Sequence, residues 1–215
     1  MDGIIENDKL RVSISEKGAE FSSILNKENN LEYLWQGDDR YWPDRAPILF
    51  PICGRLYDYK YYHNGKEYEI ALHGYYGLSH YNIVEQSKTS VIFLFQDDEE
   101  TLKSYPFHFK QFAKFSLFEN TINVDFKVVN TGCEPMIFSI GAHPGFNVPL
   151  SNDENFEDYY IDFGGECYPE IIHNFHDGSP FEEYKLKDNK TIPLKHSIFD
   201  EDGLFLRKTS GFAAI

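Results

Sequence analysis

Two histidines in this chain share a setting that suits proton transfer. His73 is followed directly by Gly74, and His143 ends an apolar stretch and is followed by Pro144 and Gly145. Proline restricts the residue before it to extended conformations, and glycine lets another group approach the backbone closely. An imidazole titrates near neutral pH, so it can both donate and accept protons. The pattern predicts a shared acid–base site, and the competing interpretation is a structural histidine at a strand corner.

Two charged residues stand in comparable places. Arg55 follows the short run 51–54, which ends in glycine, so its guanidinium can present a fixed fork of hydrogen-bond donors. Asp202 closes an acidic run and precedes the apolar residues 204–206, which would let it face a cleft at a strand end. The alternatives are a surface salt bridge for the arginine and a solvated face for the acidic run.

Aromatic residues gather near these positions, and their chemistry suits a sugar. Sugars present apolar C–H faces and polar hydroxyl edges, so aromatic walls combined with Arg, His and Asp side chains can bind them. Most of these rings are nevertheless expected to belong to the core. The residues concerned are Trp35, Tyr41, Trp42, Phe50, Tyr75, Tyr76 and Phe146.

The composition narrows the class of function. The 35 acidic and 20 basic residues give a formal net charge of −15, which disfavours nucleic acid and anionic membrane surfaces as partners. Cys53, Cys133 and Cys167 are widely spaced, and the other histidines, which we interpret as solvated, lack the close spacing of a zinc motif. With no signal-like or membrane-length apolar segment, the chain is expected to be a soluble cytoplasmic protein.

The hydrophobic pattern predicts an all-β protein. Alternation with a period of two marks the clearest strand at residues 122–128, and only residues 99–105 look helical. Many short strands separated by turns favour a β-sandwich over alternating βαβ units, and the length suits one domain over residues 1–215. The other expected strands are 10–15, 21–25, 67–72, 91–95, 112–117, 136–143, 159–163, 192–194 and 204–206.

These motifs resemble the aldose 1-epimerase (galactose mutarotase) family, in particular its LacX-like branch. The resemblance spans nearly the whole chain, and GAHP at 141–144 with an upstream HG at 73–74 is fairly specific. The matching segments, in the family's order, are YWP at 41–43, PILFPICGRL at 47–56, LHGY at 72–75, YPF at 105–107, VNTG at 129–132, GAHPGF at 141–146 and DGL at 202–204. The resemblance implies a large twisted antiparallel β-sandwich with an open sugar-binding cleft.

The resemblance also implies an activity and a set of site residues. The activity is interconversion of the α and β anomers of an aldose by acid–base ring opening, without a cofactor. His143 would be the general acid that protonates the ring oxygen, and His73 would hold the sugar near that oxygen. Arg55 and Asp202 would bind hydroxyl groups. The aromatic contacts to the sugar are expected from Tyr75 and Phe146.

Two departures from the family pattern bear on activity. After His73 and Gly74 the family often carries an arginine, which Tyr75-Tyr76-Gly77 lacks. The family's general-base glutamate would lie beyond Ile215, so the base is unknown in this chain. We therefore expect a truncated form without the family's C-terminal strands, weakly active or inactive alone. An exposed sheet edge would let such a chain self-associate.

Two other functions stay open. A hexose-6-phosphate 1-epimerase would need clustered Lys or Arg for the phosphate, which the charge of −15 and the lone Arg55 disfavour. A non-catalytic sugar-binding or sensing domain would keep the cleft and lack the base. The preferred expectation is a small neutral aldohexose as partner, with no cofactor, metal, nucleic acid or membrane.

Overall fold

The structure of the protein is a computed structural model that describes residues 2–164, 170–173, 183–185, 190–200, 204–207, 209 and 211–215. The chain forms two compact units, Met1–Asn147 and Val148–Ile215, and each is described by itself. The expectation of one domain over residues 1–215 stays a prediction. Asp202 lies outside the described residues.

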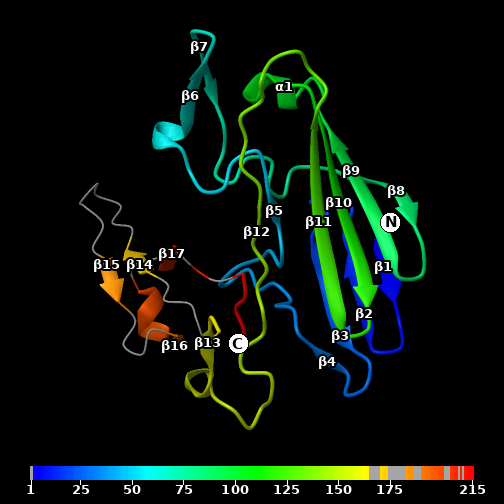
Figure 1. The fold of residues 1–215 in the computed structure, drawn as a ribbon, viewed down its shortest axis with the longest axis vertical. Coiled ribbons are helices and arrows are strands. Elements are labelled where there is room, and N and C mark those ends of the chain that lie inside the picture. Colours follow the sequence, from blue (N-terminus) through cyan, green and yellow to red (C-terminus); the bar gives the residue numbers. More distant parts are fainter. Residues whose placement is uncertain are drawn as a thin grey trace. The chain divides into compact units, whose positions relative to one another are not determined.

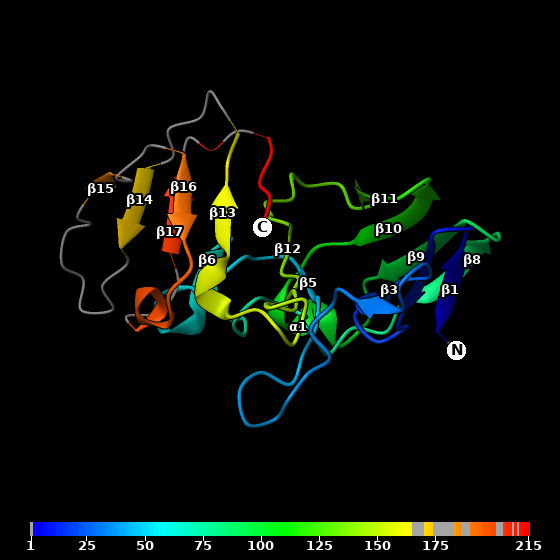
Figure 2. The same cartoon turned by 90° about the horizontal axis from the view of Figure 1, so that it is seen from below.

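Two four-stranded antiparallel sheets lie face to face in the first unit and form a sandwich (Figures 1 and 2). The strand order of one sheet is β1 (Gly3–Glu6), β2 (Leu10–Ile14), β3 (Phe21–Asn26) and β4 (Leu31–Glu32). The order of the other is β11 (Thr121–Asn130), β10 (Phe109–Phe118), β9 (Ser90–Gln96) and β8 (Asn82–Gln86). The all-β fold predicted from the alternation is confirmed.

The core of the first unit lies between the inward faces of these sheets. Because successive side chains of a strand point to opposite faces, β10 buries every second residue along its first nine. Phe21 of one sheet meets Phe115 of the other edge to face, with ring centroids 5.0 Å apart. Each large apolar side chain buried in this way contributes about 1.5–3 kcal/mol.

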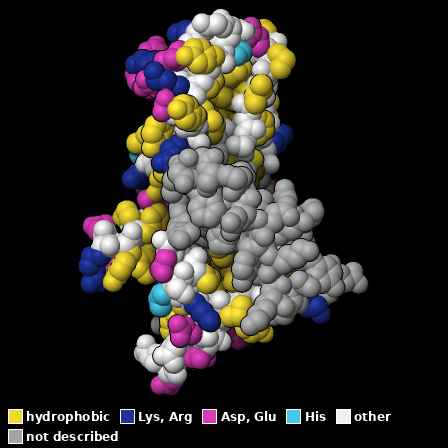
Figure 3. All heavy atoms as spheres, turned by 90° about the vertical axis from the view of Figure 1, so that its left-hand side faces the viewer, with side chains coloured by type: hydrophobic (Ala, Val, Ile, Leu, Met, Phe, Trp, Pro, Cys, Tyr) yellow, Lys and Arg dark blue, Asp and Glu magenta, His cyan; other side chains and the backbone are white. Residues whose placement is uncertain are grey.

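Two short strand pairs, a 3-10 turn and a short helix lie outside the two four-stranded sheets. β5 (Ile48–Leu49) pairs with β12 (Gly141–Ala142), and β6 (Lys60–His63) pairs with β7 (Lys66–Glu69). A 3-10 turn at Tyr57–Tyr59 precedes β6, and the short helix α1 (Thr101–Ser104) follows β9, where the sequence predicts a helix. Hydrophobic and charged side chains mix on the face that Figure 3 shows, at the end that carries the β6–β7 hairpin.

The strands expected to lead into the two histidines are shorter than their patterns predict. β7 ends at Glu69, and His73 lies in a turn with φ of 60° instead of at a strand end. Of the expected strand 136–143, only Gly141–Ala142 pairs as a strand, with Leu49 and Ile48 of β5. The preceding residues are held by isolated bonds, such as Ser139 N–H to the Pro51 carbonyl at 2.9 Å.

The second unit is built from short strands around a small core. The expected strands 159–163, 192–194 and 204–206 are confirmed to within a few residues. The elements are β13 (Tyr160–Asp162) paired with β16 (Thr191–Pro193), β14 (Glu170–His173) between β15 (Glu183–Lys185) and β17 (Leu204–Arg207), and 3-10 turns at Phe156–Asp158 and His196–Phe199. Among its described residues, Phe163 and Ile192 form a buried cluster, and Leu194 is buried as well. In the part of the chain that the structure describes, no helix has the length and apolar character to cross a bilayer.

Candidate functional site

The segment around β5 is the shared neighbour that brings the two histidines together. On one side, β5 pairs with β12, and the His143 N–H donates to the Pro47 carbonyl at 3.0 Å. On the other side, the Tyr75 N–H donates to the Phe50 carbonyl at 2.8 Å, next to a parallel bridge between Phe50 and Gly74. Residues 47–50 therefore fix the backbone of both histidine segments at once.

Gly74 is required by this arrangement. Its φ is +71°, a region that residues with a Cβ rarely adopt, and a Cβ at this position would lie 2.3 Å from the Phe50 carbonyl oxygen. His73 also has a positive φ, of 60°. Backbone conformations of this kind persist only where the surrounding structure enforces them. The turn that presents His73 is thus held in place by its contact with the residues that follow β5.

The imidazoles of His73 and His143 face each other. Their ring centroids lie 6.0 Å apart with an interplanar angle of 51°. His73 is half-buried and His143 is exposed. Burial, and secondarily the neighbouring charge of His143, lowers the pKa of His73 below its ordinary value of 6.5. His73 therefore remains neutral to lower pH than a solvated histidine.

One hydrogen bond fixes which nitrogen of His73 carries the proton. The backbone N–H of Gly54 donates to the ring nitrogen Nδ1 of His73 at 2.9 Å. The backbone N–H of His73 donates back to the Gly54 carbonyl at 2.8 Å. A backbone N–H can only donate, so Nδ1 must be the unprotonated nitrogen of the neutral ring. The proton of His73 then lies on Nε2, which is the nitrogen left to donate to a ligand.

Trp42 closes the other side of His143. Its indole lies edge to face with that imidazole, at 5.1 Å between centroids. The Trp35 indole N–H donates to the Trp42 carbonyl at 2.9 Å, and this bond holds the backbone at Trp42 against the Trp35 side chain. Gly145 makes this approach feasible, because a Cβ there would lie 2.8 Å from the Trp42 ring and 3.1 Å from Trp35 Cβ.

Tyr76 and Asp44 extend the site beyond His73. The Tyr76 ring lies edge to face with the imidazole of His73, at 5.9 Å between centroids, and the Tyr76 hydroxyl donates to the Asp44 carboxylate. The sequence places Trp42 and Tyr76 among the aromatic residues near the motifs, but no pattern in it singles out Asp44. Asp44 lies two residues after Trp42, in the loop between β4 and β5.

The other predicted site residues differ in where the structure places them. Arg55 is exposed and follows Gly54, so its backbone lies beside the His73 turn. Tyr75 turns into the core instead, where its ring packs on Phe95 and its hydroxyl bonds to the Thr101 carbonyl at 2.7 Å. Chain adjacency to His73 is therefore misleading for Tyr75. Asp202 lies outside the described residues.

Phe146 lies on the face of its segment opposite to His143. Ala142, Pro144 and Phe146 line an apolar cavity of about 540 Å³ between the sheets, and His143, one residue out of phase, points toward Trp42 and His73. The expected aromatic contact from Phe146 is therefore not at the histidine pair. Trp42 and Tyr76 are the aromatic residues that flank it.

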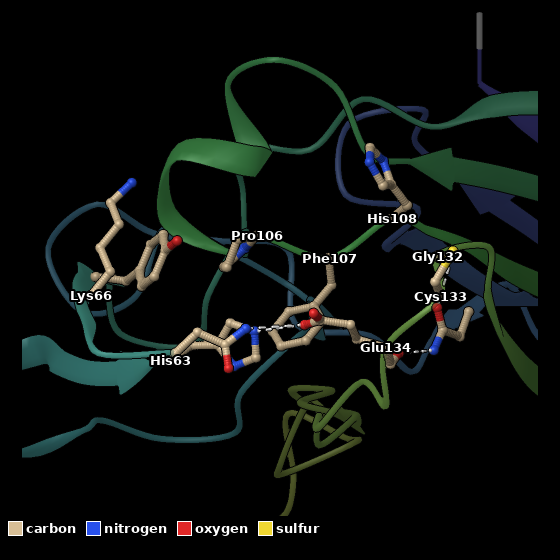
Figure 4. A pocket seen from close by; sticks show the side chains of 11 residues that line it. His63, Lys66, Pro106, Phe107, His108, Gly132, Cys133 and Glu134 are labelled. Carbon is tan, nitrogen blue, oxygen red and sulfur yellow. Dashed lines mark hydrogen bonds and ion pairs between the residues drawn. The ribbon is translucent and has the colours of Figure 1, made fainter.

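A second cavity, of about 460 Å³, lies beside the β6–β7 hairpin and contains two further histidines, His63 and His108 (Figure 4). The side chains of His63 and Glu134 are directed toward each other, with Nε2 and Oε2 3.2 Å apart. His63 also packs on Phe107, with ring centroids 4.7 Å apart. The interpretation of His63 as solvated is wrong, because its side chain is only 25% exposed.

Several polar groups that line this hairpin cavity are hydrogen-bonded to other side chains or to the backbone. Glu134 accepts from Asn64 as well as from His63, and its carbonyl accepts from the Asn130 amide at 2.7 Å. His108 Nδ1 is bonded to Asp97 at 2.6 Å. Within the described ranges, no group of three or more His, Cys, Asp or Glu side chains could hold a metal ion, at this cavity or elsewhere. We assign the hairpin cavity a structural role.

The chain matches the model of a known protein family. The model described as aldose 1-epimerase matches residues 4–172, which is well over half of the chain. The LacX proteins of Lactococcus lactis subsp. lactis, plasmid and chromosomal, are each 33% identical over 216 residues, covering 94% of this chain and 71% of the relative.

Solved structures agree with the family model. A galactose mutarotase related enzyme from Lactobacillus acidophilus is 35% identical, covers 95% of this chain and 68% of that chain, and superposes with a TM-score of 0.87. A galactose mutarotase-like protein from Lactobacillus casei is 30% identical, covers 96% of this chain and 71% of that chain, and has a TM-score of 0.86. Sequence and structure together show that this chain belongs to the aldose 1-epimerase family.

Proposed function

We propose that this protein interconverts the α and β anomers of a neutral aldohexose by acid–base ring opening. The observation that carries the proposal is the pair of facing imidazoles of His73 and His143, with ring centroids 6.0 Å apart, in a chain of the aldose 1-epimerase family. Two imidazoles on rigid backbone, one half-buried and one exposed, supply proton donors near neutral pH.

The roles of the two histidines follow from their surroundings. His143, exposed beside Trp42, gives its proton to the ring oxygen as the C1–O5 bond breaks. His73, kept neutral with its proton on Nε2, donates a hydrogen bond to an oxygen of the sugar and orients it. A carboxylate base removes the proton of the C1 hydroxyl, which becomes the carbonyl of the open chain.

Rotation about the C1–C2 bond then exposes the other face of the carbonyl. Ring closure reverses both proton transfers, so the two groups return to their starting protonation states and no cofactor is consumed. General acid–base groups of this kind contribute about 10²–10⁴-fold each to the rate. The base is the one role for which the described residues offer no assignment by motif.

Polarimetry of freshly dissolved α-glucose and α-galactose tests the proposal directly. The expected result is a first-order decay of optical rotation whose rate exceeds the spontaneous rate in proportion to protein concentration. The acceleration should be weak, because the described residues offer no assigned base. Binding of the sugar without any acceleration would support the sugar-binding or sensing alternative. Stronger competition by glucose 6-phosphate than by glucose would support the phosphate-ester alternative.

We also propose self-association through the β11 edge. Among the described strands, β11 pairs only with β10, and its inner face contributes Ile122, Val124 and Phe126 to the apolar cavity of about 540 Å³. An open strand edge next to apolar surface tends to recruit another chain. Size-exclusion chromatography with light scattering should show concentration-dependent dimers that Val124→Lys reduces and Asn123→Lys, on the opposite face, does not. A monomer at all concentrations contradicts the proposal.

A cytoplasmic location is likewise a proposal. It is supported by the two cysteines in the described part of the chain, Cys53 and Cys133, which are both free thiols. Thiols of this kind are typical of reducing compartments.

A further inference from the structure

Ring contacts and one hydrogen bond link five side chains in a row that includes the two histidines. Trp42 contacts His143, His143 faces His73, and His73 contacts Tyr76 through ring pairs with centroids 5.1, 6.0 and 5.9 Å apart. The Tyr76 hydroxyl then donates to Asp44, which stands two residues from Trp42 in the chain. One short stretch of loop therefore flanks the histidine pair on both sides, with an indole at one end and a carboxylate at the other.

The Asp44 carboxylate has hydrogen-bonding capacity to spare. It is partly buried, and Oδ2 accepts the bond from Tyr76. The structure records no other partner for this carboxylate among the described residues. An ionised carboxylate is an acceptor only, with about four lone-pair sites on its two oxygens. Oδ1, and the second lone pair of Oδ2, therefore remain for donors that a ligand brings.

The unused acceptor positions of the Asp44 carboxylate favour some ligands over others. The hydroxyl groups of a neutral sugar are donors, and a carboxylate is the strongest acceptor they can meet in a protein. A phosphate ester of the sugar keeps its other hydroxyl donors, but its phosphate is an anion that the carboxylate repels. A chain with a formal net charge of −15 adds to that repulsion.

We propose that Asp44, held in place by Tyr76, binds hydroxyl groups of the substrate and selects a neutral aldose over its phosphate ester. This inference rests on the proposed function, because it concerns the substrate class of the same site. It goes further in naming a carboxylate that the family's motifs do not mark. It also assigns the Asp44–Tyr76 hydrogen bond to substrate recognition.

Isothermal titration calorimetry with glucose and with glucose 6-phosphate tests the inference. Asp44→Asn keeps the size of the side chain and removes its charge, and we expect glucose to bind about 10-fold to 100-fold more weakly. Glucose 6-phosphate loses the same hydroxyl contacts but is also freed from repulsion, so its affinity should fall less and the ratio of the two dissociation constants should shift toward the ester. Tyr76→Phe, which removes the hydroxyl that holds Asp44, should shift the same ratio in the same direction by a smaller factor.

Asp39→Asn is the matched control. Asp39 is exposed on the same loop, so its replacement changes the net charge equally and should leave the ratio at the wild-type value. Because the ratio is measured within each variant, a fraction of unfolded protein does not alter it. Near-ultraviolet circular dichroism of each variant checks the fold separately.

Each outcome has a defined meaning. If Asp44→Asn binds glucose as tightly as the wild-type protein does, the role of Asp44 is overturned and the proposed function stands. A shift in Asp39→Asn equal to that in Asp44→Asn also overturns it, since the effect would then be one of net charge. Failure of the wild-type protein to bind either sugar overturns the proposed function and this inference together.

Discussion

The histidine pair and the hairpin cavity use the same side chain in opposite ways. At the hairpin, His63 is paired with Glu134 and His108 with Asp97, so a ring nitrogen of each is occupied by a carboxylate. At the site, His73 and His143 face each other, and the partner of His73 is a backbone N–H on Nδ1. A carboxylate is thus the ring partner of each hairpin histidine, whereas the site histidines lie against a backbone N–H and the neighbouring rings of Trp42 and Tyr76.

The backbone differs between the two regions in the same sense. The turn that joins β6 to β7 places Gly65 at φ +77° with open space around it, so only local geometry demands the glycine. The turn at His73 places Gly74 against the Phe50 carbonyl, so tertiary contact demands it. A turn fixed by a neighbouring segment positions its side chain more rigidly than a free hairpin turn, which suits a site that must align proton transfers.

The largest effect should come from His143. Replacement by Asn should remove most of the acceleration of mutarotation, because the proton donor to the ring oxygen is lost and such a group typically contributes about 10²–10⁴-fold. Because the side chain of His143 is exposed, its replacement should leave the fold intact. His63→Asn is the control, and its rate should stay near wild type. Equal losses in both variants, measured by polarimetry at matched concentrations, would remove the distinction between the two regions.

Gly74→Ala should be next in size. A Cβ at 2.3 Å from the Phe50 oxygen, combined with φ of +71°, should reduce the free energy of unfolding by about 2–3 kcal/mol. Gly65→Ala carries only the backbone strain and should cost about 1 kcal/mol. Urea denaturation measures both. If the two variants are equally destabilised, the tertiary contact does not support the His73 turn.

The pH dependence of His73 gives a smaller and more specific test. Its folded-state pKa is lowered by burial and then by His143, so in the pH window beneath 6.5 the unfolded chain binds more protons than the folded one. The contribution of His73 to stability is therefore present at higher pH and lost as pH falls through that window. His73→Gln should flatten this part of the stability curve.

Nuclear magnetic resonance titration separates the two causes. In His143→Asn the neighbouring positive charge is gone, so the pKa of His73 should rise while staying below 6.5, because burial is the larger cause. An unchanged His73 pKa would mean that the two imidazoles do not interact in solution.

The smallest effect should come from the hairpin pair. Glu134→Gln removes a carboxylate whose side chain is 61% exposed, so we expect a loss of only about 0.2–1 kcal/mol in the free energy of unfolding and no change in mutarotation rate. A double-mutant cycle with His63→Gln isolates the pair itself. A change in rate would show that the hairpin cavity takes part in function.

Long regular strands were predictable from sequence because their signal is local. The alternation at residues 122–128 predicts β11, which the structure confirms as Thr121–Asn130 paired with β10. The length over which a strand pairs with a distant segment has no such local signal. The apolar run 136–143 reads as one strand, yet only Gly141–Ala142 pairs, with β5 far away in the sequence.

The site was predictable in its histidines and less so in what surrounds them. His73 and His143 follow from their glycine neighbours and from the family's motifs. Tyr75 and Tyr76 are adjacent and chemically alike, and only the fold decides that one packs on Phe95 and the other on His73. Asp44 lies in an irregular loop, where no periodicity indicates which side chains point inward.

The contact between Trp42 and His143 has an optical consequence. Protonated imidazole quenches the emission of a nearby excited indole, so the fluorescence of Trp42 should report the charge on His143. The chain contains only 2 tryptophans, and the second, Trp35, has its indole N–H bonded to the Trp42 carbonyl. A fluorescence titration of the unlabelled protein, compared with Trp35→Phe, would thus follow the charge of the proposed acid without any added probe. The same signal should change when a sugar displaces solvent from beside the two rings.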